Sequence, residues 1–396
     1  MRPSLRQVLF RSATGLDLNF AGGAFSLNNT RSASPAAIPG WSFSRTDTNG
    51  TATALDLAGN VIEFATGVPR ITNRGILVEE ARTNLCIADW QAPGVGVSIT
   101  STTITNPVGG TTAIRVTGLL AAAGDRAGSS VALVSVGVQY AGAVFIKGTA
   151  GEKISVYTKR LNGTSATSAT VQVTFTGLWQ RVENLVMTTA TGNTGIIVWI
   201  NNNGTTDTAN TVDLWNAQVE AGAFSTSPII TTGAAGTRGA DVALVDSLTS
   251  ITYPLTMVGE WSREGGTDAT TSYRVASLSR VADDSYSEIY QRHTSNVVRA
   301  FQRTLAAGQA DVTLGTGSIG DVQRAAARFA TNDVTGSFNG AAVVSDTVVT
   351  MPASPPLSFA VGSTNGTSRW LNGYIRRVQV LPYAVTDAQL QALTAP

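Results

Sequence analysis

The chain has 396 residues, a length that predicts two or three domains. Only 13% of the residues are charged, and 27 Lys and Arg against 26 Asp and Glu leave a net charge of +1. This balance gives no overall attraction to nucleic acid or to an anionic membrane, so neither nucleic-acid binding nor membrane insertion is predicted. Hydrophobic residues make up 43%, which excludes a wholly disordered chain, and the 40 glycines are typical of a turn-rich β protein.

Short segments with period-two alternation of apolar and polar residues follow one another and predict β-strands, for example at 153–158, 171–175 and 212–215. The most apolar stretch, 131–146, also alternates and is too short for a membrane-spanning helix. Asn-Gly pairs favour type I′ hairpin turns, and six of them begin at Asn49, Asn162, Asn203, Asn339, Asn365 and Asn372. The sequence therefore predicts an all-β protein built of tandem antiparallel β-sandwiches.

Three regions are distinguished by composition. Residues 1–85 contain several prolines and few long strand patterns, so we expect an irregular N-terminal region there. Residues 86–232 carry at least six alternating segments and predict one sandwich. A small-residue linker follows, and residues 240–396 predict a second sandwich that ends in a short helix, where Thr386 and Gln389 form a capping box.

The single cysteine, Cys86, and the single histidine, His293, exclude disulfides and multi-histidine or cysteine-cluster metal sites. A catalytic triad would need His293, and no GxSxG motif accompanies it. No spacing singles out a carboxylate pair for glycoside hydrolysis, so no catalytic residue and no metal site is predicted. We expect Cys86 to be a buried structural thiol. The segment 283–288, DDSYSE, resembles an oxygen-rich calcium loop, and a solvated turn is the alternative.

Candidate ligand-binding residues come from the chemistry of sugars. Aromatic rings stack on the apolar face of a pyranose, while amide, carboxylate and guanidinium groups bind its hydroxyls. Most aromatic residues lie within strand patterns and are expected in the cores. Glycan-binding candidates with polar neighbours are Tyr286, Tyr290, Arg292 and Asp284, together with Asn202 in a polar hairpin tip.

The segment GILVEEARTNL at residues 75–85 resembles GLLIEEARTNLL, a motif of tail-fibre, minor-tail and head-spike proteins of tailed phages, prophages and gene-transfer agents. Residues 41–46 and 68–70 are similar to the segments that precede it in those proteins. Residues 213–228 resemble the closing strand of their carbohydrate-binding-module-like jelly rolls. Parts of the last region are similar to concanavalin-like or laminin-G-like sandwiches, namely 327–330, 337–340 and 371–377 with the C-terminal helix.

This resemblance implies a virion structural protein, a tail fibre or spike, that attaches to host-surface polysaccharide and is not an enzyme. It implies assembly in the host bacterial cytoplasm, other virion proteins as partners, and a homo-oligomer, commonly a trimer. Residues 1–85 would then be the virion anchor. Within the motif, Glu79, Glu80, Arg82 and Asn84 are expected to form a structural junction, with Arg82 paired to a carboxylate and Asn84 capping a turn.

Two other functions remain open from the sequence. One is a purely structural baseplate, collar or head-decoration protein whose sandwiches contact only protein. The other is a polysaccharide depolymerase, which would release reducing sugar from a host polysaccharide.

Overall fold

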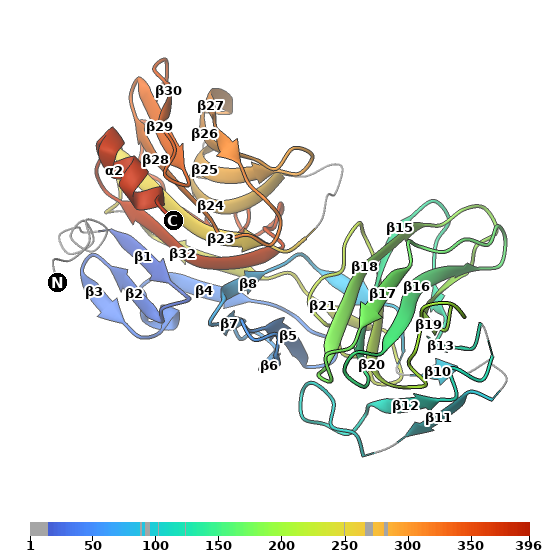
Figure 1. The fold of residues 1–396 in the computed structure, drawn as a ribbon. Helices are drawn as coiled ribbons and strands as arrows, with labels where there is room; N and C mark the ends of the chain where they lie inside the picture. The colour runs from blue at the N-terminus through green and yellow to red at the C-terminus, as the bar shows by residue number, and fades with distance from the viewer. Residues whose placement is uncertain are drawn as a thin grey trace. The chain divides into compact units, whose positions relative to one another are not determined.

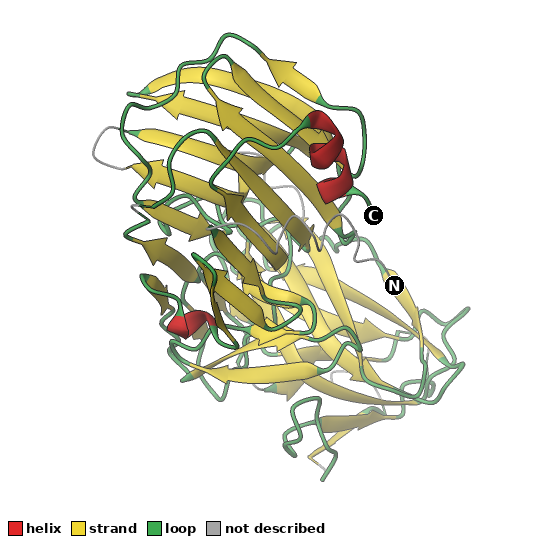
Figure 2. Ribbon diagram, turned by 90° about the vertical axis from the view of Figure 1, so that its left-hand side faces the viewer, coloured by secondary structure: helices red, strands yellow, loops and turns green. Residues whose placement is uncertain are grey.

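The computed structural model of the chain describes residues 15–396 except 88, 92–95, 102, 123, 249, 266–271 and 281–283. The described residues form antiparallel β-sheets with two short helical segments, η1 (Pro35–Ala37) and α2 (Asp387–Thr394) (Figure 2). The predicted all-β fold class is confirmed. No helix among the described residues is long and apolar enough to cross a membrane.

The chain divides into two compact units. The first, which we call the terminal unit, contains the described residues up to Arg45 together with Gly67–Glu80 and Ala240–Pro396. The second, the inserted unit, contains Thr46–Thr66 and Ala81–Gly239. Each unit is a β-sandwich with its own hydrophobic core.

The terminal unit has a ten-stranded sheet (Figure 1). Its strands run in the order β3 (Thr30–Ser32), β2 (Ala24–Leu27), β1 (Leu16–Asn19), β32 (Gly373–Leu381), β23 (Leu255–Arg263), β28 (Gln323–Ala330), β29 (Asp333–Phe338) and β30 (Val344–Asp346), while β8 (Gly75–Val78) pairs with β32 and with β7 (Ile71–Thr72).

A seven-stranded sheet forms the other layer of this unit. Its order is β27 (Ala307–Thr316), β26 (Val297–Thr304), β25 (Ser285–Arg292), β24 (Ser272–Arg280), β31 (Ser358–Val361), β22 (Val242–Asp246) and β4 (Trp41–Ser44). Alternate residues of both sheets point into one shared core, as Leu18 of β1, Trp261 of β23 and Phe359 of β31 illustrate.

The N-terminal strands are integral to this sandwich. Strand β1 pairs with β32, with Leu18 opposite Val378, and β4 pairs with β22. Residues 1–85 are therefore not a separate region, and the predicted domain boundary at 85 is wrong. The division of the chain into two units depends on pairing between short strands that are far apart in the sequence. Local composition does not reveal that pairing.

The inserted unit packs a six-stranded sheet and a five-stranded sheet around a second core. The first contains β10 (Trp90–Gln91), β13 (Arg126–Ser129), β19 (Gly195–Asn201), β16 (Lys153–Leu161), β17 (Val171–Thr174) and β14 (Ala132–Leu133). The second contains β11 (Ser98–Ser101), β12 (Ile114–Thr117), β20 (Thr211–Ala221), β15 (Gln139–Lys147) and β18 (Gln180–Thr188). Two pairs complete the unit: β9 (Arg82–Asn84) with β21 (Gly236–Arg238), and β5 (Thr51–Leu55) with β6 (Val61–Ala65).

The local turn and cap signals are largely realised. Both residues of the Asn-Gly pairs at 162, 339 and 365 have positive φ, as a type I′ turn requires. At Asn49 and Asn203 only the following glycine has positive φ, and at Asn372 only the asparagine does. The capping box of α2 is present, because Thr386 Oγ1 accepts from Gln389 N and the Gln389 side chain accepts from Thr386 N.

Cys86 is fully buried in the inserted unit, as the sequence predicts, and burial raises the pKa of its thiol to about 12. The thiolate is the reactive form of cysteine, so native Cys86 should react slowly with iodoacetamide at pH 8. We expect its rate to be at least ~1,000-fold lower than in denaturant, which corresponds to a free energy of ~4 kcal/mol for the opening that exposes the thiol. Mass spectrometry of timed samples measures both rates. Native labelling within a factor of ten of the denatured rate contradicts the burial.

Candidate functional site

The outer face of the seven-stranded sheet collects aromatic and charged side chains on β24, β25, β26 and β27. Core residues such as Leu278, Ile289 and Ala300 fix which side faces inward, so their alternating neighbours face outward. The strand register aligns these outward side chains in three rows: Arg274, Tyr290 and Arg299; Ser277, Glu288, Phe301 and Asp311; and Ser279, Tyr286 and Arg303. We call this set the aromatic–arginine face.

A buried ion pair anchors one side of this face. Arg274 Nε lies 2.7 Å from Glu288 Oε2, and both side chains are almost completely excluded from solvent. Ser277 Oγ donates to Glu288 Oε1 at 3.0 Å. The guanidinium of Arg274 also lies over the ring of Tyr290, with its carbon 4.6 Å from the ring centroid. These contacts hold the Tyr290 ring in one orientation.

Asp311 organises the next part of the face. Its carboxylate accepts a hydrogen bond of 3.0 Å from the Tyr290 hydroxyl and pairs with Arg299 Nε at 2.7 Å. Arg292 Nη2 lies further away, at 3.6 Å, and its side chain is 46% exposed. Burial and the neighbouring Asp311 raise the pKa of Tyr290, so its hydroxyl remains a hydrogen-bond donor.

Tyr286 and Phe301 supply the accessible aromatic surface. Their ring centroids are 5.7 Å apart, and both side chains are half-buried. Arg303 lies over Tyr286 at 5.6 Å from the ring centroid and donates to Asp284 Oδ2 at 2.6 Å. An apolar ring surface beside fixed donors and acceptors is the chemistry that binds a sugar ring with its hydroxyl groups.

Four of the five predicted glycan-binding residues lie together on this sheet or at the turn that precedes β25: Asp284, Tyr286, Tyr290 and Arg292. Tyr290 is only 7% exposed, because the Arg274 guanidinium covers its ring.

Asn202 differs from the other four. It lies in the inserted unit and is buried, where it donates to Ala122 O at 3.3 Å and accepts from Gly204 N at 2.9 Å. Its amide therefore stabilises a loop of the inserted unit.

The sequence prediction missed several residues of the face. Arg299, Phe301 and Arg303 alternate with buried Val298, Ala300 and Gln302 along β26, a period-two signal that could have assigned them to the outer side. Asp311 carries the same signal, because it alternates with buried Ala310 and Val312 along β27. Only the pairing of strands, which the sequence does not show, brings Arg274 and Asp311 to the same face as Tyr290.

The predicted calcium loop is only partly described, since Asp283 lies outside the described residues. Asp284 pairs with Arg303, and Glu288 pairs with Arg274. Within the described ranges, no three His, Cys, Asp or Glu side chains are grouped closely enough to hold a metal ion.

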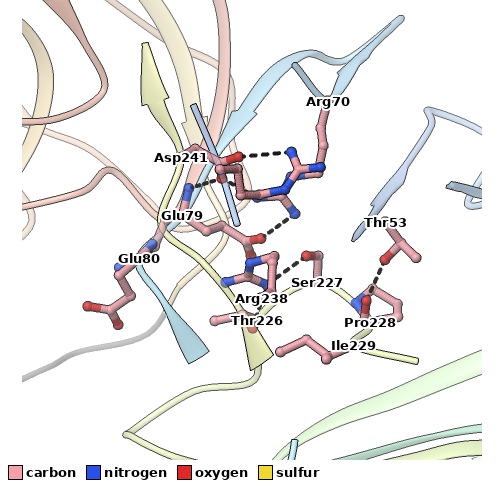
Figure 3. Close-up of polar contacts among 12 residues, drawn as sticks. Thr53, Arg70, Glu79, Glu80, Thr226, Ser227, Pro228, Ile229, Arg238 and Asp241 are labelled. Carbon is pink, nitrogen blue, oxygen red and sulfur yellow. Dashed lines mark hydrogen bonds and ion pairs between the residues drawn. The ribbon is translucent and has the colours of Figure 1, made fainter. Parts of the chain in front are cut away.

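The motif at residues 75–85 makes intramolecular contacts in both units. In the terminal unit, Arg70 Nη1 donates to Glu79 Oε2 at 2.8 Å, and Arg70 also pairs with Asp241 (Figure 3). Asp241 accepts from Glu79 N at 2.9 Å and pairs with Arg45 at 3.3 Å. The backbone N–H of Glu80 donates to Asn372 Oδ1 at 3.1 Å.

In the inserted unit, Asn84 makes four hydrogen bonds. Its Oδ1 accepts from Cys86 N and Val219 N at 3.0 Å each, and its Nδ2 donates to the carbonyls of residues 217 and 229. Arg82 lies over the Phe224 ring, 5.1 Å from its centroid. Burial raises the pKa of Glu220, and the positive charge of Arg82 opposes this shift. The hydrogen bonds of Glu79 and Asn84 hold strands in place within each unit.

No protein-family model and no curated protein matches the chain. Among solved structures, it is similar to the CBM40 of Ruminococcus gnavus IT-sialidase bound to α2,3-sialyllactose, with 13% identity, a TM-score of 0.31, and 38% of this chain and 86% of that chain covered. A native heptameric SAP-like pentraxin from Limulus polyphemus matches with 11% identity and a TM-score of 0.28, over 35% of this chain and 69% of that chain. Trypanosoma rangeli sialidase in complex with DANA matches with 10% identity and a TM-score of 0.32, over 38% of this chain and 25% of that chain. These partial likenesses carry no information about what this chain binds.

Proposed function

We propose that the protein is a virion structural protein, a tail fibre or spike of a tailed phage, that attaches to host-surface polysaccharide through the aromatic–arginine face. The resemblance of residues 75–85 to the phage motif supports the virion role. The observation that carries glycan attachment is the half-buried Tyr286–Phe301 pair beside Asp311 and the two arginines near its carboxylate, Arg299 and Arg292.

A weak binding free energy at each site is sufficient when many copies of the site act together. A net hydrogen bond contributes about 1 kcal/mol, and a millimolar site needs only about 4 kcal/mol. Display of several chains, as in the trimer that the resemblance implies, raises apparent affinity about 10²–10⁴-fold. A single weak site on each chain is therefore sufficient for attachment to a polymer.

The carboxylates of the face favour recognition without cleavage. A glycoside hydrolase needs one carboxyl group that donates a proton to the leaving oxygen. Glu288 is held by Arg274 and Ser277, and Asp311 is held by Arg299 and Tyr290, so both act as acceptors of fixed hydrogen bonds. We therefore propose that the protein is not an enzyme.

Substitution of Tyr286 by Ala is expected to weaken retention of the full-length protein on bacterial envelope polysaccharide about tenfold per site, the effect of ~1.4 kcal/mol of lost stacking. Arg292→Ala should weaken retention by a smaller factor, because its side chain is more exposed. Leu178→Ala, which removes a 72% exposed apolar side chain from the inserted unit, is the matched control and should leave retention unchanged. Binding to an immobilised panel of envelope polysaccharides measures all three variants.

New reducing ends are measured in the same samples. Retention without new reducing ends supports attachment. Release of reducing sugar supports the depolymerase, and absence of both supports a purely structural particle protein.

A further inference from the structure

The outer face of the ten-stranded sheet is divided into an apolar half and a polar half. Helix α2 covers the first half, where Leu390 and Leu393 pack against Val258, Ala326 and Leu381 of the sheet. Because α2 covers the outer side of β23, β28 and β32 at these residues, the strands are buried there on both sides. The helix does not extend over β1, β2 and β3, whose outward side chains are polar except for Ala24.

The polar half extends across four neighbouring strands, as their register shows. Arg31 of β3 lies opposite Ser26 of β2, Ser26 lies opposite Asp17 of β1, and Asp17 lies opposite Gln379 of β32. Neighbouring strands are about 4.8 Å apart, so these side chains form a row of polar groups with that spacing. They line a cavity of about 450 Å³, together with Asn19, Asn29, Ser32 and Arg377 among others. We call this cavity the β1–β3 groove.

Gln379 supplies the groove with an amide donor that has no partner in the described part of the chain. Its side chain is only 2% exposed, and its Nε2 has no hydrogen-bond partner among the described residues. A buried polar group of this kind is normally paired, because an unpaired one loses its hydration without compensation. The lining of the groove therefore presents an amide donor that a bound acceptor would satisfy.

The charges of the groove favour an anion. Arg377 and Asp17 pair through two parallel hydrogen bonds, of 2.8 and 2.5 Å, and neutralise one another. Arg31 is exposed, and no carboxylate in the described part of the chain pairs with it. The guanidinium of Arg31 is planar and matches a carboxylate in geometry as well as charge.

We propose that the β1–β3 groove binds an acidic saccharide, with the sugar carboxylate on Arg31 and sugar hydroxyls on Gln379, Ser26 and Asn29. A volume of about 450 Å³ lies within the range of small-molecule sites, and a sugar supplies the several hydroxyl groups that the polar row can bind. This site is independent of the aromatic–arginine face, which lies on the other sheet.

The test uses the full-length protein and galacturonic acid trisaccharide, with the methyl ester of the same trisaccharide as the uncharged control ligand. Titration calorimetry should show binding of the acid that weakens with added salt and is at least tenfold weaker for the ester. Arg31→Gln should weaken binding of the acid at least tenfold. Lys159→Gln, which removes a cation from the inserted unit, should have no effect.

Gln379→Met keeps the length of the side chain but removes the donor, and should weaken binding of both the acid and the ester. If this variant does not fold, as judged by circular dichroism, Arg31→Gln decides the question, because an exposed side chain on the edge strand β3 contributes little to folding.

Absence of binding, equal binding of acid and ester, or unchanged binding by Arg31→Gln overturns the proposal. Binding that is lost in Tyr286→Ala and retained in Arg31→Gln places the trisaccharide on the aromatic–arginine face, which overturns this site and leaves the proposed function standing. Binding that is lost in Arg31→Gln and retained in Tyr286→Ala supports the groove.

Discussion

A fragment of residues 240–396 is expected not to fold by itself. Its two sheets would lack β1 and β8 beside β32 and β4 beside β22, which exposes the edges of strands that are central in the intact unit. Its core would also lose seven buried apolar side chains that come from earlier in the chain: Leu16, Leu18, Phe20, Phe25, Ile38, Ile76 and Val78.

The size of this loss decides the outcome. Burial of one large apolar side chain stabilises a fold by about 1.5–3 kcal/mol, so seven of them contribute roughly 10–20 kcal/mol. A domain of ordinary stability has about 5–15 kcal/mol in total. The loss therefore equals or exceeds the stability that the fragment could retain.

Circular dichroism and thermal unfolding of the isolated fragment measure this prediction. The control is residues 81–239, which contain every strand of the two main sheets of the inserted unit and lack Thr46–Thr66, the segment with the β5–β6 hairpin. Leu55 and Val61 of that hairpin belong to a small satellite cluster, so the control should fold with reduced stability. A cooperative melt of 240–396 comparable to that of the control would show that the N-terminal strands are dispensable.

The domain boundary was unpredictable because its information is not local. Alternating apolar residues, Asn-Gly turns and the α2 capping box act over fewer than ten residues, and the sequence alone predicted the fold class from them. Leu18, in contrast, lies opposite Val378, 360 positions away, and β1 is only four residues long. A strand of four residues has too short a pattern to indicate which sheet it completes.

The candidate site was predictable only in part for a related reason. The pair of tyrosines beside Arg292 follows from composition, but the inner and outer sides of β25 do not follow from polarity. Ser287 points into the core, where its hydroxyl donates to Gln302 Oε1 at 2.6 Å and contacts the Tyr253 hydroxyl at 2.8 Å. Glu288, although charged, is fully buried on the outer side. Ser287 and Glu288 are therefore buried because they are hydrogen-bonded and not because they are apolar. The alternation of apolar and polar residues does not reveal burial of this kind.

Replacement of Arg70 by Met is expected to destabilise the terminal unit by about 3–5 kcal/mol, the usual cost of removing one partner from a buried ion pair. Arg70 is completely buried and bonds to two carboxylates, Glu79 and Asp241. Burial alone would lower the pKa of Arg70, but Asp241 and Glu79 more than offset that effect and raise it. Without Arg70, Glu79 and Asp241 would each lose a fully buried cationic partner, although Arg45 still lies 3.3 Å from Asp241.

Arg328→Met is the matched control for this prediction, because Arg328 also pairs with two carboxylates, Asp333 and Asp387, in the same unit. Those carboxylates are 32% and 56% exposed, so water replaces the lost arginine and the expected cost is about 1 kcal/mol or less. Urea unfolding followed by tryptophan fluorescence measures both variants. The triple variant R70M/E79Q/D241N should recover part of the loss, since it removes the uncompensated charges together with their partner. Equal destabilisation by Arg70→Met and Arg328→Met would mean that burial of the Arg70 cluster contributes nothing beyond a surface ion pair.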